Sequence, residues 1–423
     1  MTRLQSKQIS LLHLYQVLHS VRLGRSPVSR AEIALATGLS QPAVSSLTRR
    51  LLESGALMEV GARPSLGGGR RERELAVNPD FAWVVGVKVS MHQITLALVD
   101  FAGGVRNTLK VPLAAPVTQA ALLQRLVKEI KACLAAADPQ VHQRLAGVGV
   151  AVPGMVDSLR GEVHWSPLLK PGRKDESAPL AAPLTEALGV PVMIENDANM
   201  LALAEQWFGE AARLTHVAVV TLEHGLGLGL VLDGELFRGH SGLAAEFGHI
   251  QVVPEGRACR CGKKGCLEAY VAHSAVVGQG QEAGLLPAGD LPSADIEAAY
   301  LELADKARAG NRRARQIFEQ QGELLGRWMG NMVNLLAPQI VVLDGMREGT
   351  ELFHESLQRA MNDALAIPHR QRDLLVVHHR GDETWARGAA SLVLQRLDES
   401  AEILESVSRH GFDIEADGHR PAT

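Results

Sequence analysis

The chain has few cysteines, few aromatic residues and no long apolar run. Only 4 of its 423 residues are cysteine, and Phe, Trp and Tyr together make up 4%. So few cysteines in so long a chain exclude a small secreted domain held by disulfides. No apolar segment approaches the roughly 20 residues of a membrane-spanning helix, and the first residues lack a signal-peptide pattern. We therefore expect a cytoplasmic protein of two or three domains with no membrane partner.

The net charge of -4 conceals an uneven distribution of sign. Residues 1–82 hold 11 Lys and Arg against 6 Asp and Glu, a balance of +5 that leaves -9 for the remainder. A small basic segment ahead of an acidic body is common in nucleic-acid-binding proteins, although +5 alone is weak support.

The basic segment contains a helix-turn-helix pattern. Residues 9–18 repeat apolar side chains at helical spacing, residues 29–38 form an Ala-rich helix, and another helix covers residues 41–54 behind the N-cap Ser40. The last of these helices has an apolar stripe that faces the core. The polar side chains outside the stripe, which are candidates for the DNA major groove, are Gln41, Ser45, Ser46, Thr48, Arg49 and Arg50.

A glycine-rich and arginine-rich hairpin follows these helices. Residues 56–60 and 74–77 read as two strands joined by residues 61–73, a pattern that predicts a wing. Its glycines allow a close approach to DNA, and its arginines suit phosphate or minor-groove contacts. The arginines in question are Arg70, Arg71 and Arg73. We predict a winged helix-turn-helix domain over residues 1–82 that binds operator DNA as a homodimer or homotetramer; a dimerisation or docking module is the weaker alternative.

The rest of the chain predicts an α/β fold. Three antiparallel strands, a helix and a parallel strand come first, and a second such set follows. We expect two lobes and a cleft over residues 83–397, with a ribonuclease-H-like order of elements, and a polar tail over residues 398–423. The expected strands are 83–89, 94–100, 105–111, 146–152, 190–195, 216–222, 227–232, 234–237, 339–343 and 374–378. The expected helices are 119–137, 198–208, 312–336, 351–365 and 384–397.

Three of the four cysteines lie close to a histidine in sequence. The spacing His249…Cys259-x-Cys261-x4-Cys266 supplies the Cys3His ligand set of a structural zinc site, so residues 249–266 are predicted to form a zinc loop. Because four protein ligands close a tetrahedral site, we expect no catalytic role for the ion. Buried thiols or a redox switch are weaker alternatives, since the segment is too polar for a core and the cysteines are too close for simple disulfides.

Four motifs in order resemble the ROK family of sugar kinases and sugar-responsive repressors over about residues 83–397. The motifs are Pro153-Gly154-Met-Val-Asp157, Glu195-Asn196-Asp197-Ala198-Asn199, Glu246-x-Gly248-His249 and Cys-x-Cys-Gly-x-x-Gly-Cys-Leu-Glu268. With the winged helix in front, the whole chain is similar to the transcriptional regulators of that family. The resemblance implies an actin-like, sugar-kinase-like fold and a monosaccharide effector. It also implies contacts to sugar hydroxyls from Asn196, Asp197, Glu246, His249 and Glu268.

Two of these assignments have a second interpretation. His249 is claimed both by the metal and by the sugar, and an imidazole can serve both through its two ring nitrogens. Asn196 and Asp197 stand between a strand and a helix, where capping alone would explain them.

The motifs that bind the nucleotide in the kinases of this family are only partly present in this chain. ROK kinases open with an Asp-x-Gly-Gly-Thr turn that approaches ATP phosphates and organises magnesium, whereas this chain has Lys88-Val-Ser90-Met91-His92. The second phosphate loop is partly kept in residues 224–229, and Asp344-Gly345 replaces a paired-glycine turn. We therefore predict a sugar-responsive regulator, most simply a repressor, that is not an enzyme. The alternatives are an ATP-dependent sugar kinase with a fused DNA-binding domain and a regulator controlled by a protein partner.

Overall fold

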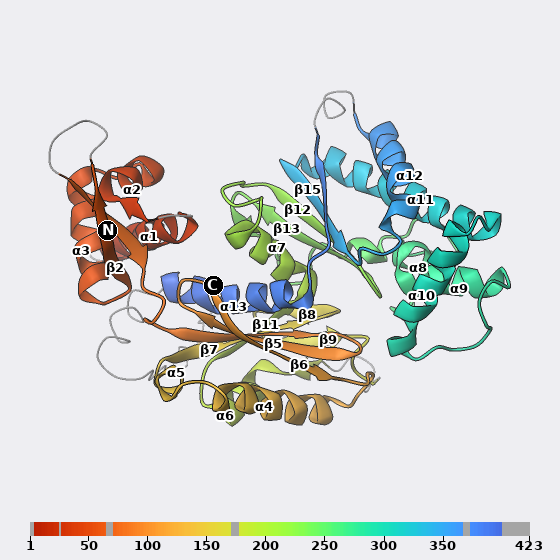
Figure 1. Ribbon diagram of the computed structural model, residues 1–423, viewed down its shortest axis with the longest axis horizontal. Helices are drawn as coiled ribbons and strands as arrows, with labels where there is room; N and C mark the ends of the chain where they lie inside the picture. The colour runs from red at the N-terminus through yellow and green to blue at the C-terminus, as the bar shows by residue number, and fades with distance from the viewer. Residues whose placement is uncertain (1–3, 25–26, 65–70, 171–176, 367–372, 400–423) are drawn as a thin grey trace.

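The computed structural model describes residues 4–24, 27–64, 71–170, 177–366 and 373–399. The chain forms a small amino-terminal domain and two lobes, each built on a five-stranded sheet, with two helices between the sheets (Figure 1). In the described ranges, no helix combines the length and the apolar composition needed to cross a membrane.

The amino-terminal domain is the expected three helices and hairpin. Ser29 and Glu32 form a capping box, and the Ser40 side chain accepts from the backbone N–H of Ala43, so both helix starts were predictable from local chemistry. The strands are longer than predicted and pair in the order β1-β3-β2. The elements are α1 Leu4–Leu23, β1 Val28–Ser29, α2 Arg30–Thr37, α3 Gln41–Glu53, β2 Leu57–Arg63 and β3 Glu72–Val77.

The first lobe has the sheet order β11-β7-β4-β5-β6, in which the first three strands along the chain are antiparallel and β7 runs parallel to β4, as predicted. Helices α4 and α6 cover its outer face (Figure 1). A small sheet of β8, β9 and β10, which the sequence did not predict, extends this lobe. The elements are β4 Trp83–Val89, β5 Gln93–Asp100, β6 Val105–Pro112, α4 Gln119–Ala135, α5 Pro139–Gln143, β7 Leu145–Val152, β8 Met155–Asp157, β9 Glu162–Trp165, β10 Ala178–Pro179, α6 Ala181–Leu188 and β11 Val192–Asn196.

The second lobe has the sheet order β14-β13-β12-β15-β16. The long amphipathic α11 packs against α12 and buries the outer face of this sheet. Helices α8, α9 and α10 were not predicted. The elements are β12 Val217–Leu222, β13 Leu226–Leu232, β14 Glu235–Leu236, η1 Phe247–His249, α8 Glu268–Val271, α9 His273–Glu282, α10 Ser293–Arg308, α11 Arg312–Leu336, β15 Ile340–Gly345, α12 Thr350–Ala364 and β16 Leu375–His378.

Two helices, α7 (Asp197–Phe208) and α13 (Asp382–Glu399), pack against each other between the two sheets (Figure 1). Helix α13 lies directly on the first sheet, since a Cβ at Gly149 would stand 1.8 Å from the carbonyl oxygen of Ala389. Helix α13 also continues past the predicted boundary at residue 397. Its penultimate residue, Asp398, is buried in an ion pair with Arg22, so the polar tail begins later than expected. The remainder of the predicted tail, residues 400–423, lies outside the described residues.

Candidate functional site

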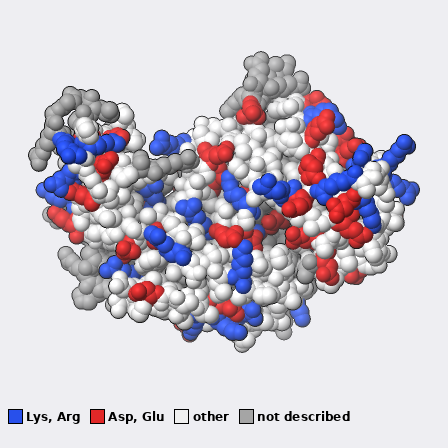
Figure 2. All heavy atoms as spheres, viewed as in Figure 1, with Lys and Arg blue, Asp and Glu red and all other residues white. Residues whose placement is uncertain are grey.

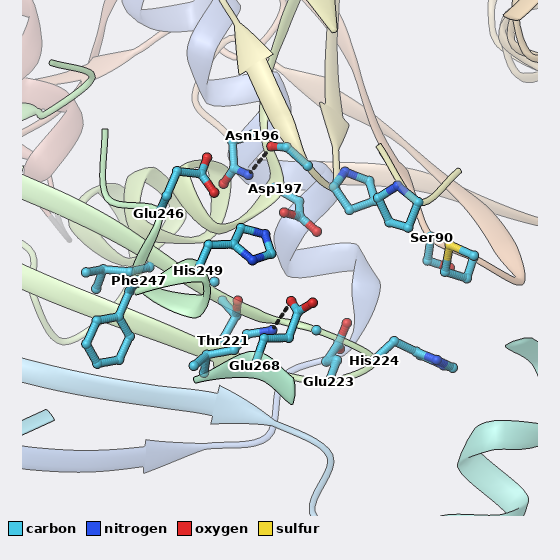
Figure 3. Close-up of a pocket in the computed structure, with 18 of the residues that line it drawn as sticks. Ser90, Asn196, Asp197, Thr221, Glu223, His224, Glu246, Phe247, His249 and Glu268 are labelled. Atoms are coloured by element: carbon cyan, nitrogen blue, oxygen red, sulfur yellow. Dashed lines mark hydrogen bonds between the residues drawn. The ribbon is translucent and has the colours of Figure 1, made fainter. Parts of the chain in front are cut away.

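A cleft of about 900 Å³, its open mouth included, lies where the two lobes meet. Both lobes supply its walls, and Figure 3 shows carboxylates and an imidazole from several separate elements projecting into it. The five residues expected to contact a sugar, Asn196, Asp197, Glu246, His249 and Glu268, all line this one cleft. The structure therefore brings together residues that are up to 72 positions apart in the sequence.

The start of α7 places Asn196 and Asp197 at the cleft. Asn196 is the N-cap, because its Oδ1 accepts from the backbone N–H of Asn199 at 3.2 Å, while its Nδ2 donates to the Gly154 carbonyl at 2.9 Å. Asp197 is the first residue of the helix and accepts from the N–H of Ala198 at 3.0 Å. Burial raises the pKa of Asp197 to about 6. Capping and a place in the cleft thus coexist at Asn196, as its two interpretations allowed.

Two glutamates from the second lobe face Asp197. Glu268, the first residue of α8, accepts from the N–H of Leu226 at 3.1 Å and from the Arg260 guanidinium at 3.3 Å. Glu246 precedes η1, and burial, together with the charges of Glu268 and Asp197, raises its pKa to about 7. Three carboxyl groups that converge on one cleft favour a ligand rich in hydroxyl donors.

The four predicted metal ligands come together beside the cleft. The ligand atoms of His249, Cys259, Cys261 and Cys266 all lie within 4.8 Å of one another. The Sγ atoms of Cys261 and Cys266 are 3.7 Å apart, and Cys259 Sγ is 3.6 Å from His249 Nδ1. A tetrahedral zinc site with Zn–S bonds of about 2.3 Å requires ligand separations of about 3.6–3.8 Å. The residues therefore fit a tetrahedral metal ion.

The cluster is tied directly to the cleft. Cys266 and Glu268 are two residues apart, and His249 belongs to both groups. Burial raises the pKa of Cys259 to about 12 and lowers that of His249, so a metal ion would have to displace thiol protons when it binds. A cation in this loop would consequently fix the positions of Glu268 and His249.

The nucleotide side of the cleft holds a buried lysine. The side chain of Lys88 is 1% exposed, and its Nζ lies 2.8 Å from Asp382 Oδ1 and 3.1 Å from Glu223 Oε2. The ammonium group also lies 3.6 Å from the centre of the Trp385 ring. Burial alone would lower the pKa of Lys88, but Glu223 and Asp382 raise it above its usual value, so the lysine stays charged.

The neighbouring positions are also altered. Ser90 and Met91 line the cleft with side chains where the kinase turn has glycines, and the Ser90 hydroxyl is bonded to the Gln93 carbonyl at 3.1 Å. At the end of β15, the buried Asp344 accepts from the N–H of Arg380 at 3.1 Å and faces its guanidinium. Both features agree with the departures read from the sequence.

The residues expected to contact DNA lie on two elements. Gln41, Ser45, Ser46 and Arg49 are exposed on α3, whereas the half-buried Arg50 donates to Ser10 of α1 at 3.3 Å. Placing Thr48 among the exposed polar residues was wrong, because its side chain is buried, donates to the Val44 carbonyl and accepts from Arg30.

The wing is described only at its base. Arg71 is exposed and donates to the Ala62 carbonyl at 2.5 Å, and Arg73 pairs with Glu59. Arg70 and the glycine run lie outside the described residues. On the face seen in Figure 2, basic and acidic side chains alternate over the amino-terminal domain, so its positive balance does not form one continuous patch there.

Several residues of the cleft were not predicted from the sequence. Glu223, Arg260 and Trp165 line it, and Trp165 makes an edge contact with the His249 ring, with 5.8 Å between ring centres. A signal for Glu223 existed, because it directly follows β12 beside the altered phosphate loop. Nothing in the local sequence marked Trp165, since β9 itself was not predicted.

The sequence is similar to known proteins over most of its length. The profile of the ROK family matches residues 84–396. The chain is 29% identical to the xylose repressor of Caldicellulosiruptor bescii over 92% of this chain and 96% of that one. It is also 29% identical to the DNA-binding transcriptional dual regulator NagC of Escherichia coli, over 92% and 93%.

Solved structures of two kinds resemble the fold. A ROK family transcriptional regulator, described as a homologue of E. coli MLC, has a TM-score of 0.75, 24% identity and coverage of 95% of this chain and 99% of that one. A ROK glucokinase from Streptomyces griseus, in complex with glucose and AMPPNP, has a TM-score of 0.61, 27% identity and coverage of 74% and 99%. The regulator thus has counterparts for more of this chain than the kinase does.

Proposed function

The chain belongs to the ROK family, and from that premise we propose that it is a sugar-responsive transcriptional regulator, most simply a repressor. The amino-terminal domain binds operator DNA, and an unphosphorylated monosaccharide in the cleft is the effector. The names of its relatives, a xylose repressor and a dual regulator, support this assignment.

The observation that carries the non-enzymatic part of the proposal is the buried Lys88. In the family's kinases this position belongs to a turn that organises magnesium and nucleotide phosphates, and a fixed ammonium group cannot coordinate a metal ion. Asp382 and Glu223 already neutralise the lysine at 2.8 and 3.1 Å, so it offers no free positive charge to a phosphate. Asp197 remains in place as a potential base, but no phosphoryl donor is held for it to use.

The charge of the cleft supports an uncharged effector. Carboxyl groups outnumber the cationic side chains Lys88 and Arg260, and both cations already have carboxylate partners. The carboxyl groups near or on the cleft wall belong to Asp197, Glu223, Glu246, Glu268 and Asp382. A sugar phosphate would be repelled there, whereas neutral hydroxyl groups would find several acceptors.

For DNA, α3 is the recognition helix and the wing lies along the backbone. The exposed polar face of α3 suits base-edge contacts from Gln41 and Ser45, with Ser46 and Arg49 beside them. Arg50, Arg70 and Arg71 complete the phosphate-contacting set. Two copies in a homodimer, or four in a homotetramer, would read a roughly palindromic site.

For the metal, zinc is the ion that the ligand set favours. Three thiolates and an imidazole at tetrahedral separations suit Zn²⁺ and leave no position for water or substrate. Its role is structural: it holds the loop that carries His249 and Glu268 against the cleft.

The test is a titration of operator DNA with and without sugars. Fluorescence anisotropy with DNA from upstream of the protein's own gene, repeated with a panel of neutral monosaccharides and their 6-phosphates, should find one neutral sugar that changes the affinity. The same sugar incubated with ATP and magnesium should not be phosphorylated. ATP-dependent turnover would favour the kinase with a fused DNA-binding domain, and a lack of response to every sugar would favour control by a protein partner.

A further inference from the structure

The helix pair α7 and α13 connects the cleft to the amino-terminal domain. Both helices begin at the cleft, where Asp197 opens α7 and Asp382, bonded to Lys88, opens α13. Helix α13 packs against α1, and Figure 1 shows it running through the centre of the molecule toward that helix. Near the end of α7, the Trp207 ring lies 5.5 Å from the His19 ring of α1. With a rise of about 1.5 Å per residue, α13 spans roughly 27 Å.

A single arginine of α1 contacts the far ends of both helices. The Arg22 guanidinium forms a two-pronged ion pair with Asp398 of α13, with Nη2–Oδ1 at 2.7 Å and Nε–Oδ2 at 2.9 Å. It also lies 5.3 Å from the centre of the Trp207 ring of α7 and 4.5 Å from that of Phe101, whose carbonyl accepts from its Nη1. The side chains of Arg22 and Asp398 are 1% and 0% exposed.

The two helices pack mainly on different lobes, although the start of α7 directly continues β11 of the first sheet. Helix α13 lies on the first sheet at Gly149, as described above. Helix α7 lies on the second sheet, since a Cβ at Gly229 of β13 would stand 2.4 Å from the carbonyl oxygen of Ala198. The helices meet at Gly388, where a Cβ would stand 1.9 Å from the carbonyl oxygen of Met200. Because each helix packs mainly on one sheet, rotation of one lobe against the other would shift α7 relative to α13.

We propose, on the basis of the regulator function above, that Arg22 is the junction through which sliding of α7 against α13 reaches the amino-terminal domain. A sugar that bridges Asn196, at the end of β11 in the first sheet, and Glu246 and Glu268 of the second lobe draws the lobes together and shifts α7 against α13. Arg22 can keep both Asp398 and Trp207 in only one register, so the change alters how α1 is held. Sugar binding and DNA binding are thereby coupled through one side chain.

A purely structural role for the same contacts would behave differently. Removing one partner of a buried ion pair destabilises a protein whatever its function. Loss of stability alone therefore cannot identify a junction. The informative quantity is the ratio of operator affinities with and without sugar, because a static contact leaves that ratio unchanged.

The test compares this ratio in the full-length parent, in Arg22→Met and in Arg22→Lys. Methionine keeps an unbranched apolar stem of similar shape but cannot bridge Asp398 and Trp207. Lysine keeps the positive charge but lacks the two parallel N–H donors of the guanidinium group. For a parent whose operator affinity changes about 10-fold with sugar, within the usual range of allosteric coupling, we expect this ratio of affinities to fall below about 2 in Arg22→Met. Arg22→Lys should give an intermediate ratio. Calorimetry should give sugar affinities within about threefold of the parent, because Arg22 does not line the cleft.

The matched control is Arg308→Met, which removes an arginine bonded to Glu351 on the surface of the second lobe. It should keep the parent ratio. A parent-like ratio in Arg22→Met overturns the junction and leaves the proposed function intact.

A parent that no sugar affects overturns the proposed function instead, and a second measurement then decides the junction without sugar or DNA. Asp382→Asn loosens the cleft end of α13, so hydrogen exchange of the α1 amides should rise in that variant relative to the parent. In the Arg22→Met background, Asp382→Asn should add no further change. If Asp382→Asn raises the hydrogen exchange of the α1 amides equally in the parent and in Arg22→Met, the proposal is overturned.

Discussion

The two halves of the cleft differ in how their charges are used. On the sugar side, Glu246 and Asp197 have pKa values raised by burial and face an open space, so they gain from a ligand. On the nucleotide side, Lys88, Asp382 and Glu223 are satisfied by one another. Under the proposed function, the first half binds the sugar, whereas the charged groups of the second half already have partners without a ligand. Inspection of the fold alone, which both regulators and kinases share, would not separate them.

The largest expected effect concerns the proposed zinc loop, residues 249–266, which under the proposed function supports the sugar side of the cleft. Cys266→Ser removes one of the proposed zinc ligands, so metal content should fall well below one ion per chain and sugar affinity should fall by more than 100-fold or vanish. Metal analysis measures the metal content, and calorimetry measures the sugar affinity. Cys133→Ala, which alters the cysteine outside the cluster, should keep both. A variant that lacks metal but binds sugar normally would show that the loop does not support the site.

The next effect concerns the nucleotide side of the cleft, where Lys88 is paired with Asp382 and Glu223. Lys88→Met leaves Asp382 and Glu223 without their cation, so we expect a loss of about 3–5 kcal/mol in unfolding free energy by denaturant titration. Adding Asp382→Leu should recover part of that loss, since it removes one of the stranded carboxylates. Additive losses in the double variant would mean that the two residues do not act as a pair.

A smaller effect is expected from one carboxylate of the sugar half. Glu268→Gln keeps the size of the side chain but weakens its acceptance of sugar hydroxyls, so affinity should fall by about 10- to 100-fold, or about 1.5–3 kcal/mol. The exposed Glu255→Gln in the same loop is the control and should bind as the parent does. Unchanged affinity in Glu268→Gln would remove this residue from the site.

The smallest effect is a pH dependence that distinguishes the halves. Because the pKa of Asp197 is raised from 3.8 to about 6, the folded protein binds the extra proton between these values, and this residue's contribution to stability falls as pH rises through them. Relative to the parent, Asp197→Asn should therefore gain about 2 kcal/mol in unfolding free energy as the pH rises from 4 to 7.5. Thermal or denaturant unfolding at both pH values measures this gain, with the exposed Asp290→Asn as the control. A gain that does not grow with pH would contradict the raised pKa.

Local chemistry explains what the sequence could predict. Caps such as Ser40 and the strict apolar patterns of the main strands fixed most element positions, and the motif resemblance located the five residues that share the cleft. The partners of Lys88 could not be predicted, because Asp382 lies 294 positions away and meets it only through the packing of α13 on β4. The small sheet of β8–β10 was missed for the related reason that its strands are short and depend on their neighbours rather than on periodicity.

The buried ammonium group of Lys88 also bears on what the protein can report to the cell. An enzyme that borrows magnesium and nucleotide from solution has an active site whose occupancy varies with the energy charge of the cytosol. The ammonium group of Lys88 is part of the chain, so its presence does not depend on the concentration of magnesium or nucleotide. Under the proposed function, transcription would follow nutrient supply alone, and a starved cell with depleted ATP would read the same sugar level in the same way.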